Sequence, residues 1–172
     1  MDCKMTQFDT TIFAGPDASD AEWTPSPGDE GSLDPSNEYA ALLRRNGLRP
    51  TRQRVALSSI LFSNGNRHLT AEMLHAEAVA ARVPLSLATV YNNLHQFTQA
   101  GLIRQISVDG SKCFFDTNPT EHHHFFLTGE YALLDIPAGD VVVGRLPVQP
   151  DGYEIARVDV VIRLRCKEPS AR

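Results

Sequence analysis

The chain has 172 residues, of which 42% are hydrophobic and 22% charged, with a formal net charge of -5. These values suit one or two small globular domains and exclude a fibrous or wholly disordered protein. No run of about 18 apolar residues occurs and the N-terminus lacks a secretory pattern, so we expect a cytoplasmic protein without a membrane-spanning helix. The three cysteines, Cys3, Cys113 and Cys166, are far apart, which disfavours both a disulfide framework and a paired-cysteine zinc site.

The charges are unevenly distributed along the chain. Residues 1–35 carry one lysine and eight acidic residues, whereas residues 36–108 carry eight arginines and three glutamates. Residues 109–172 carry seven basic and ten acidic residues. A basic segment between acidic ones is typical of a module that binds a polyanion. We expect residues 1–35, which are rich in Asp, Gly, Pro and Ser, to form a disordered acidic arm, and residues 168–172 to form a short tail.

The apolar spacing after residue 35 predicts four short helices. Thr70 and Ser86 are suitable N-cap residues for the third and fourth, and Gly47 and Gly101 are suitable ends for the first and fourth. The expected segments are 36–47, 50–66, 70–84 and 86–99.

The hydrophobic period changes from helical to alternating after residue 101. Residues 102–108 and 112–116 flank Asp109-Gly110, which is a strong two-residue hairpin signal. Helices followed by a β-hairpin form a winged helix-turn-helix in which the fourth helix takes the recognition position. We therefore predict a winged-helix DNA-binding domain over residues 36–117.

Residues 118–167 predict a second, smaller domain that consists mostly of strands. Apolar or alternating stretches indicate strands over 124–127, 131–136 and 153–166, while residues 141–143 fit either a short strand or a helix. About 50 residues enclose only a small core, which favours pairing with a second copy of the chain.

The fourth predicted helix carries side-chain types that read DNA bases. Asparagine pairs with adenine, and a threonine methyl group or a tyrosine ring packs on thymine methyl groups. Arginines upstream can contact phosphates or enter a minor groove. The candidates are Ser86, Thr89, Tyr91, Asn92 and Asn93 on the helix, and Arg44, Arg45, Arg49, Arg52 and Arg54 before it. The alternative is a surface helix beside a solvated basic patch.

Three consecutive histidines, His122, His123 and His124, indicate a ligand site, because imidazole commonly binds transition metals and haem iron. On a strand, His122 and His124 would point to one face and His123 to the other. A solvated polar turn is the alternative. The aromatic residues that follow, Phe125 and Phe126, suit either an apolar haem pocket or the core.

Four motifs in this order and spacing resemble the ferric uptake regulator family. They are residues 47–54 (GLRPTRQR), residues 68–74 (HLTAEML), residues 88–91 (ATVY) with Leu94 and residues 101–103 (GLI), and the triple histidine. The resemblance implies an α+β protein with an N-terminal winged helix-turn-helix domain followed by a small C-terminal α/β dimerisation domain. It also implies a homodimer on AT-rich operator DNA, with Tyr91 at a base and Arg49 at the minor groove. Asn92 stands where the family often has arginine, which predicts an unusual operator.

The same resemblance implies a sensing site. His68 and Asp116 match positions that bind a regulatory metal between the two domains, together with the histidine cluster. A ligand set drawn from both domains would couple metal binding to their relative orientation. Many family members also hold structural zinc with paired cysteines, the first pair of which would fall near Gly129 and Ala132, so we expect no structural zinc.

The triple histidine, the missing cysteine pairs and Asn92 are together similar to the iron response regulator branch of the family. That similarity implies a repressor of haem-synthesis and iron-storage genes under iron limitation, with haem at His122–His124 relieving DNA binding. The Cys-Pro haem motif of some members is missing, because Lys4 follows Cys3. Cys113 fits a small packing residue of the wing.

The main alternative is a regulator that responds to manganese, ferrous iron or peroxide through His68, Asp116 and the histidine cluster. An enzyme with a hydrolytic metal site is a second alternative. The sequence has no nucleophile elbow, phosphate loop or His-Glu-x-x-His motif, so we predict that the protein is not an enzyme. A purely structural dimerisation protein is the third.

Overall fold

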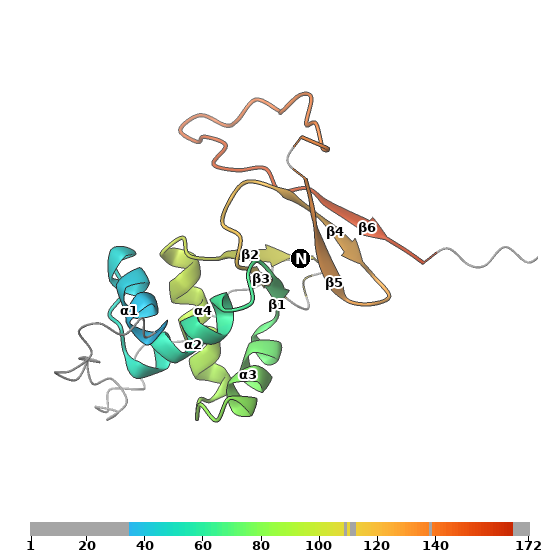
Figure 1. Cartoon of the computed structure of the whole chain (residues 1–172). Coiled ribbons are helices and arrows are strands. Elements are labelled where there is room, and N and C mark those ends of the chain that lie inside the picture. The colour runs from blue at the N-terminus through green and yellow to red at the C-terminus, as the bar shows by residue number, and fades with distance from the viewer. Residues whose placement is uncertain (1–34, 109, 111–112, 138, 167–172) are drawn as a thin grey trace, which may run out of the picture. The chain divides into compact units, whose positions relative to one another are not determined.

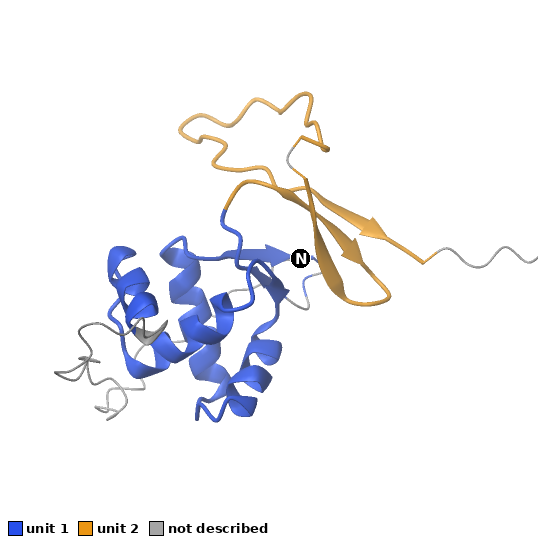
Figure 2. Cartoon of the chain, viewed as in Figure 1, with its two compact units in different colours: residues 1–119 blue, residues 120–172 orange. Residues whose placement is uncertain are grey.

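The computed structural model describes residues 35–108, 110, 113–137 and 139–166 (Figure 1). The chain divides into two compact units, residues 1–119 and residues 120–172 (Figure 2). The predicted tail, and all of the predicted acidic arm except Pro35, lie outside the described residues. No helix among the described residues is long and apolar enough to cross a membrane.

The described part of unit 1 combines four helices with a small sheet, as Figure 1 shows. The helices are α1 (Pro35–Arg45), α2 (Arg52–Phe62), α3 (Ala71–Ala80) and α4 (Leu87–Gln99). The strands are β1 (His68–Leu69), β2 (Arg104–Ser107) and β3 (Cys113–Asp116). All four predicted helices are confirmed.

Short polar side chains set the starts of three helices. The hydroxyls of Thr51, Thr70 and Ser86 each accept a hydrogen bond from the backbone N–H three residues later, which begins α2, α3 and α4. Such a cap contributes about 1 kcal/mol, because it satisfies a donor that the helix leaves unpaired. Gly47 and Gly101 follow α1 and α4 with φ angles of +74° and +72°, a conformation that glycine adopts without strain.

The core of unit 1 forms where the apolar faces of its helices meet. Leucines from every helix are fully buried there, and Leu69 of β1 and Phe115 of β3 belong to the same cluster. The central members are Leu43, Leu57, Leu61, Leu74, Leu94 and Phe97. This packing fixes α4 against the rest of the unit and leaves its opposite face to solvent.

The sheet of unit 1 has the strand order β1-β3-β2, and both pairings are antiparallel. The β2–β3 hairpin is the predicted wing, although residues 109, 111 and 112 of its turn lie outside the described residues. The strand β1 was not predicted, because two residues have no detectable period. Its neighbour Arg67 donates its backbone N–H to Thr117 Oγ1 at 2.8 Å, and Thr117 N–H donates to Arg67 O at 3.1 Å. The α2–α3 connection is thereby tied to the end of the wing.

Unit 2 contains a second three-stranded sheet among its described residues. Its strands are β4 (His123–Leu127), β5 (Ala132–Ile136) and β6 (Val161–Leu164), in the order β5-β4-β6. β4 pairs antiparallel with β5 and parallel with β6. Phe126, Leu133 and Ile136 are its buried apolar residues. The predicted α+β class is confirmed, and the described part of unit 2 contributes strands alone to it.

The long strand predicted over residues 153–166 is wrong in its extent. Only residues 161–164 are in a strand, because β4 offers a short partner edge, paired with β6 from His124↔Val161 to Leu127↔Leu164. Residues 153–160, which the prediction included, lie outside the strand. Residues 141–143 form neither a strand nor a helix.

The packing of unit 1 makes a direct stability prediction. Leu94→Ala removes a fully buried side chain of α4 and should lower the free energy of unfolding by about 3 kcal/mol, through lost burial and the cavity left behind. The measurement is urea unfolding followed by far-ultraviolet circular dichroism. Val79→Ala on α3, where the side chain is 58% exposed, is the control and should change stability by less than about 0.5 kcal/mol. Equal effects of the two substitutions would contradict the assigned core.

Candidate metal centre and nucleic-acid interface

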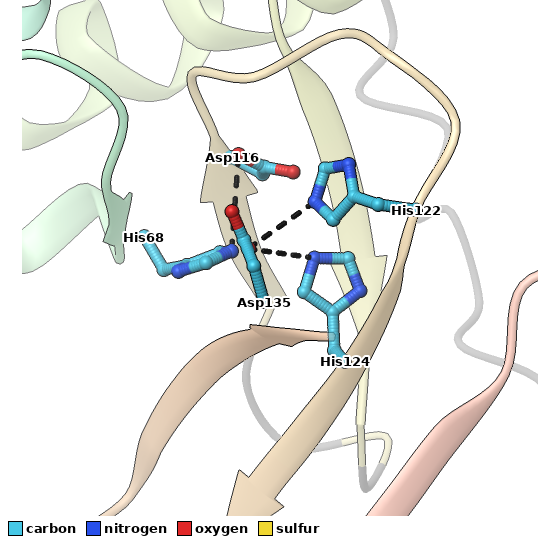
Figure 3. Close-up of side chains that lie close together, drawn as sticks. All are labelled: His68, Asp116, His122, His124 and Asp135. Carbon is cyan, nitrogen blue, oxygen red and sulfur yellow. Dashed lines mark ion pairs between the residues drawn. The ribbon is translucent and has the colours of Figure 1, made fainter. Parts of the chain in front are cut away.

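Two histidines and one aspartate come together in unit 2. His122 Nε2 lies 3.2 Å from Asp135 Oδ1, and His124 Nε2 lies 3.7 Å from the same oxygen (Figure 3). The antiparallel register places His124 directly opposite Asp135, and the rings of His122 and His124 are 4.5 Å apart. The ligand atoms of all three residues lie within 4.8 Å of one another. We call these three residues the unit 2 ligand set.

The surroundings of His122 decide which ring nitrogen faces the carboxylate. Its Nδ1 lies 2.9 Å from Thr120 O, and a carbonyl oxygen can only accept a hydrogen bond. The Nδ1 therefore carries the proton, and in a neutral ring Nε2 directs a lone pair toward Asp135. A lone pair beside a carboxylate oxygen is unfavourable unless a proton or a metal cation lies between them. The unit 2 ligand set thus has the chemistry of a cation site.

His68 and Asp116 form a second pair within unit 1, the unit 1 ligand set. The β1–β3 ladder places them opposite each other, with His68 Nε2 3.8 Å from Asp116 Oδ1 (Figure 3). Asp116 is 0% exposed, and its Oδ1 accepts the backbone N–H of Asn118 at 2.7 Å. A buried carboxylate is costly without charged or hydrogen-bonded partners. The Asn118 N–H therefore holds Asp116 Oδ1 in one orientation, beside the ring of His68.

The donor atoms of the two sets define which ions fit. Imidazole nitrogens mixed with carboxylate oxygens suit manganese, iron or zinc, whereas the soft ions that prefer thiolate would need cysteines. Among the described residues the two cysteines, Cys113 and Cys166, belong to neither set. Each ligand set, taken by itself, thus has donor atoms that suit a borderline or hard divalent ion.

His123 turns away from its two neighbours, as the strand period predicts. Its Nδ1 accepts the backbone N–H of Val160 at 3.4 Å, next to β6. His122 and His123 also line a cavity of about 470 Å³ within unit 2. The remaining lining is largely apolar and includes Val141, Val143, Ile155 and Val158, with Glu121 and Arg157.

Asp135 is the residue that sequence reasoning missed. It lies within an otherwise apolar strand, Leu133-Leu134-Asp135-Ile136, and an acidic residue in such a stretch is the only available signal. Its role depends on the β4–β5 register, which the sequence does not specify. Phe126, one of the two aromatic residues considered for a haem pocket, is 2% exposed and packs edge-on against Tyr131, so it is a core residue.

The recognition helix presents part of the predicted face to solvent. Tyr91 is 44% exposed and Asn92 is exposed as well. Ser86 is exposed but caps α4, and its Oγ lies 2.8 Å from Thr89 Oγ1. Asn93 was predicted to be exposed, and this is wrong. It is 7% exposed and donates its side-chain amide to Thr89 O, because its position on α4 falls on the core side.

The arginines before α4 divide into two kinds. Arg49 and Arg52 are exposed, as are Arg44 and Arg45. Arg54 instead donates to Arg49 O at 2.8 Å and to the side chain of Gln96 on α4. It links α2 to the recognition helix, so a role in phosphate contact is less suited to it than to Arg49.

Tyr91 has a specific partner outside its own helix. Its hydroxyl donates to Glu72 Oε1 of α3 at 2.6 Å. The hydrogen bond to Glu72, followed by burial and the negative charge of that carboxylate, raises the pKa of Tyr91 from 10.0 to about 12. Glu72 also lies in the first turn of α3, as predicted.

The helices, the wing and the exposed face of α4 define a winged-helix DNA-binding regulator. The model of the ferric uptake regulator family matches residues 45–130, which include the wing, the recognition helix and the triple histidine. The chain belongs to this family. It is therefore a transcription regulator of a metal-responsive family, and not an enzyme.

Individual relatives agree with this assignment. A ferric uptake regulation protein of Bordetella parapertussis is 32% identical over 110 residues, which cover 63% of this chain and 79% of that protein. A peroxide-responsive repressor of Staphylococcus epidermidis is 36% identical over 88 residues, which cover 51% of this chain and 57% of that protein. The solved ferric uptake regulator from Pseudomonas aeruginosa with manganese has a TM-score of 0.57 and 26% identity, covering 76% of this chain and 98% of that one.

The Glu72–Tyr91 hydrogen bond predicts a shifted phenol titration. Subtracting the phenolate absorbance of Tyr91→Phe from that of the intact protein isolates Tyr91, which should titrate near pH 12 and not near 10.0. Because the folded-state pKa is the higher one, the stability contributed by this hydrogen bond is fully present below the unfolded pKa and is lost as the pH rises through the folded one. Glu72→Ala should return the titration toward the ordinary value. An unshifted titration in the intact protein would contradict the hydrogen bond.

Proposed function

We propose that the chain binds operator DNA through unit 1 and that a divalent transition-metal ion, bound at the two ligand sets, controls this binding. The single observation that carries the metal proposal is the approach of His122 Nε2 and His124 Nε2 to Asp135 Oδ1, at 3.2 Å and 3.7 Å. Thr120 O fixes the ring nitrogen of His122 that faces the carboxylate. A cation stabilises this arrangement.

Each ligand set alone is small for a first-row transition metal. The unit 2 set offers three side chains and the unit 1 set offers two. Manganese, iron and zinc ions take about four to six ligands in proteins. We infer that His68 and Asp116 complete the coordination that His122, His124 and Asp135 begin. The bound ion would supply positive charge to join the two carboxylates and the three imidazoles.

The short connection between the two sets supports their joint use. Five residues, 117–121, separate Asp116 from His122. An extended chain of this length spans at most roughly 20 Å, which is the upper bound on the separation of the Asp116 and His122 backbones. An ion held by both sets restricts the movement of unit 1 relative to unit 2. A ligand shifts a conformational equilibrium only when it binds one state better, and joint coordination provides that difference.

A homodimer accounts for the exposed apolar surface of unit 2. Its edge strand β6 presents Ile162 and Leu164 at 36% and 37% exposure, and Val148 and Tyr153 are 93% and 75% exposed. Apolar side chains beside an open sheet edge mark an interaction surface. Two recognition helices in a dimer must match half-sites about 34 Å apart, so the orientation of unit 1 controls DNA affinity. We propose that metal favours the matching orientation.

The proposed DNA contacts follow from exposure and chemistry. Tyr91 and Asn92 would read thymine and adenine in the major groove of AT-rich DNA, with Thr89 and Ser86 beside them. Arg49 and Arg52 would contact the backbone or the minor groove. Asn92 offers an amide where the family resemblance implies arginine, and an amide favours adenine over guanine at that position.

Haem is a second candidate effector, which the cavity of unit 2 favours. Its volume of about 470 Å³, its valine and isoleucine lining and its two histidines, His122 and His123, suit an apolar ligand whose iron binds imidazole. Under this proposal the protein is a cytoplasmic repressor of haem-synthesis and iron-storage genes that haem releases from DNA. The two proposals differ in the role of His123. This residue lines the cavity proposed for haem, and it belongs to neither ligand set proposed for a metal ion.

One binding experiment separates the two effectors. The full chain is mixed with an AT-rich duplex selected from a random library, and anisotropy is measured at fixed salt with manganese(II), with haem or with neither. We expect manganese to raise the DNA affinity of the unaltered protein roughly tenfold, a typical allosteric coupling. His124→Ala and Asp135→Asn should abolish this response. His123→Ala, a matched change in the neighbouring residue, should retain it.

The opposite pattern would reverse the assignment. If haem lowers DNA affinity, His123→Ala removes that effect and manganese does nothing, then haem is the effector and the ligand sets are structural. Failure of the unaltered protein to select any duplex, with or without either effector, would contradict DNA binding itself.

A further inference from the structure

The hydrogen bond between Tyr91 and Glu72 joins the recognition helix to the helix before it. The two residues are 19 positions apart in sequence, and Tyr91 Oη donates to Glu72 Oε1 at 2.6 Å. A hydroxyl that donates to a carboxylate at this distance forms one of the stronger hydrogen bonds in proteins. Both side chains are exposed, so this bond is made on the outer face of unit 1 and not in its core.

A carboxylate is an unexpected neighbour for a DNA-reading residue. The sequence of α4, LATVYNNLHQFTQ, contains no Asp, Glu, Lys or Arg, so the recognition helix itself is free of permanent charge. Glu72 adds a negative charge beside it, which opposes the approach of phosphates. Its place in the first turn of α3 is favourable for the helix dipole, but that effect does not require the side chain to reach Tyr91.

The hydrogen bond also decides which part of Tyr91 can read DNA. The single hydroxyl proton of Tyr91 is donated to Glu72, so that proton is not available to a base. The aromatic ring remains available, and its apolar surface matches the 5-methyl group of thymine in the major groove. Because the ring is fixed at its far end by Glu72 and at its near end by α4, its position does not depend on the DNA.

We propose that Glu72 is a positioning residue for base recognition: it holds the Tyr91 ring so that the ring, and not the hydroxyl, selects thymine by its methyl group. This inference rests on the proposed DNA-binding function of unit 1. The proton stays on Tyr91 at the pH of any ordinary binding reaction, since the pKa of its hydroxyl is raised to about 12. The hydroxyl therefore keeps the proton that it donates to Glu72 under the conditions in which DNA binding is measured.

The test removes one methyl group from the DNA at a time. The full chain is used with a duplex that it selects from a random library, and each thymine is replaced in turn by uracil, which pairs identically but lacks the methyl group. The ratio of the dissociation constants for the uracil and thymine duplexes is measured at fixed salt. For the unaltered protein we expect a ratio of roughly four at one thymine in each half-site, the effect of burying one methyl group.

Variants then distinguish an effect of Glu72 on the position of the Tyr91 ring from an effect of its negative charge. Glu72→Ala and Tyr91→Phe each break the hydrogen bond, so the ratio should fall toward one in both, and the double variant should show no further loss. Glu72→Gln keeps an acceptor oxygen for the hydroxyl and should keep the ratio. Glu38→Ala, a loss of the same charge from the exposed first turn of α1, is the matched control and should keep the ratio as well. Thermal unfolding checks that each variant folds.

Three results would overturn this proposal. An unchanged ratio in Glu72→Ala, with tighter binding to every duplex in both Glu72 variants, would mean that Glu72 only repels phosphates. An altered preference at a G·C pair in Glu72→Ala, with the thymine ratio unchanged, would mean that Glu72 reads cytosine directly and does not position Tyr91. A ratio of one in the unaltered protein would mean that Tyr91 reads no methyl group. If the unaltered protein selects no duplex, the proposed function fails first.

Discussion

The antiparallel pairing of β3 with β1 is the constraint on which the rest of unit 1 depends. It places His68 opposite Asp116, while β2 places Arg104 opposite the same aspartate from the other side. The two hydrogen bonds between Arg67 and Thr117 extend the pairing and close the wing against the α2–α3 connection. Because β1 runs directly into Thr70, the N-cap of α3, only this short paired strand separates Asp116 from the helix that carries Glu72.

This connection links Asp116 of the proposed sensing site to the proposed DNA-binding face through contacts within unit 1. One end of the connection is a buried carboxylate, Asp116, and the other is an exposed ring, Tyr91, held by Glu72. Each link is a strand pairing, a helix cap or a hydrogen bond. Unit 2 differs from unit 1 in its core: its described strands bury few apolar side chains and leave others exposed. A small core of this kind suits a unit whose order depends on a bound ion and on a second copy of the chain.

The sequence predicts the helical part of this structure well, because local chemistry decides it. Thr70 and Ser86 start helices by accepting hydrogen bonds close by in the chain, and leucines at helical spacing form the core. The features that the sequence does not predict depend on contacts between residues that are distant in the chain. Asp135 acquires its neighbours only through the β4–β5 register, and β1 exists only because β3 pairs with it. Asn93 is buried because of the way α4 rotates onto the core, which its polarity does not reveal.

The central claim is that metal and DNA bind to one coupled system. The most direct measurement is the manganese(II) affinity of the full chain, by competition with a fluorescent chelator, with and without a saturating selected duplex. Coupling is reciprocal, so DNA must raise the manganese affinity by the same factor by which manganese raises the DNA affinity. We predict a rise of roughly tenfold in the unaltered protein, and no rise in Asp135→Asn. An identical manganese affinity with and without DNA would contradict the account.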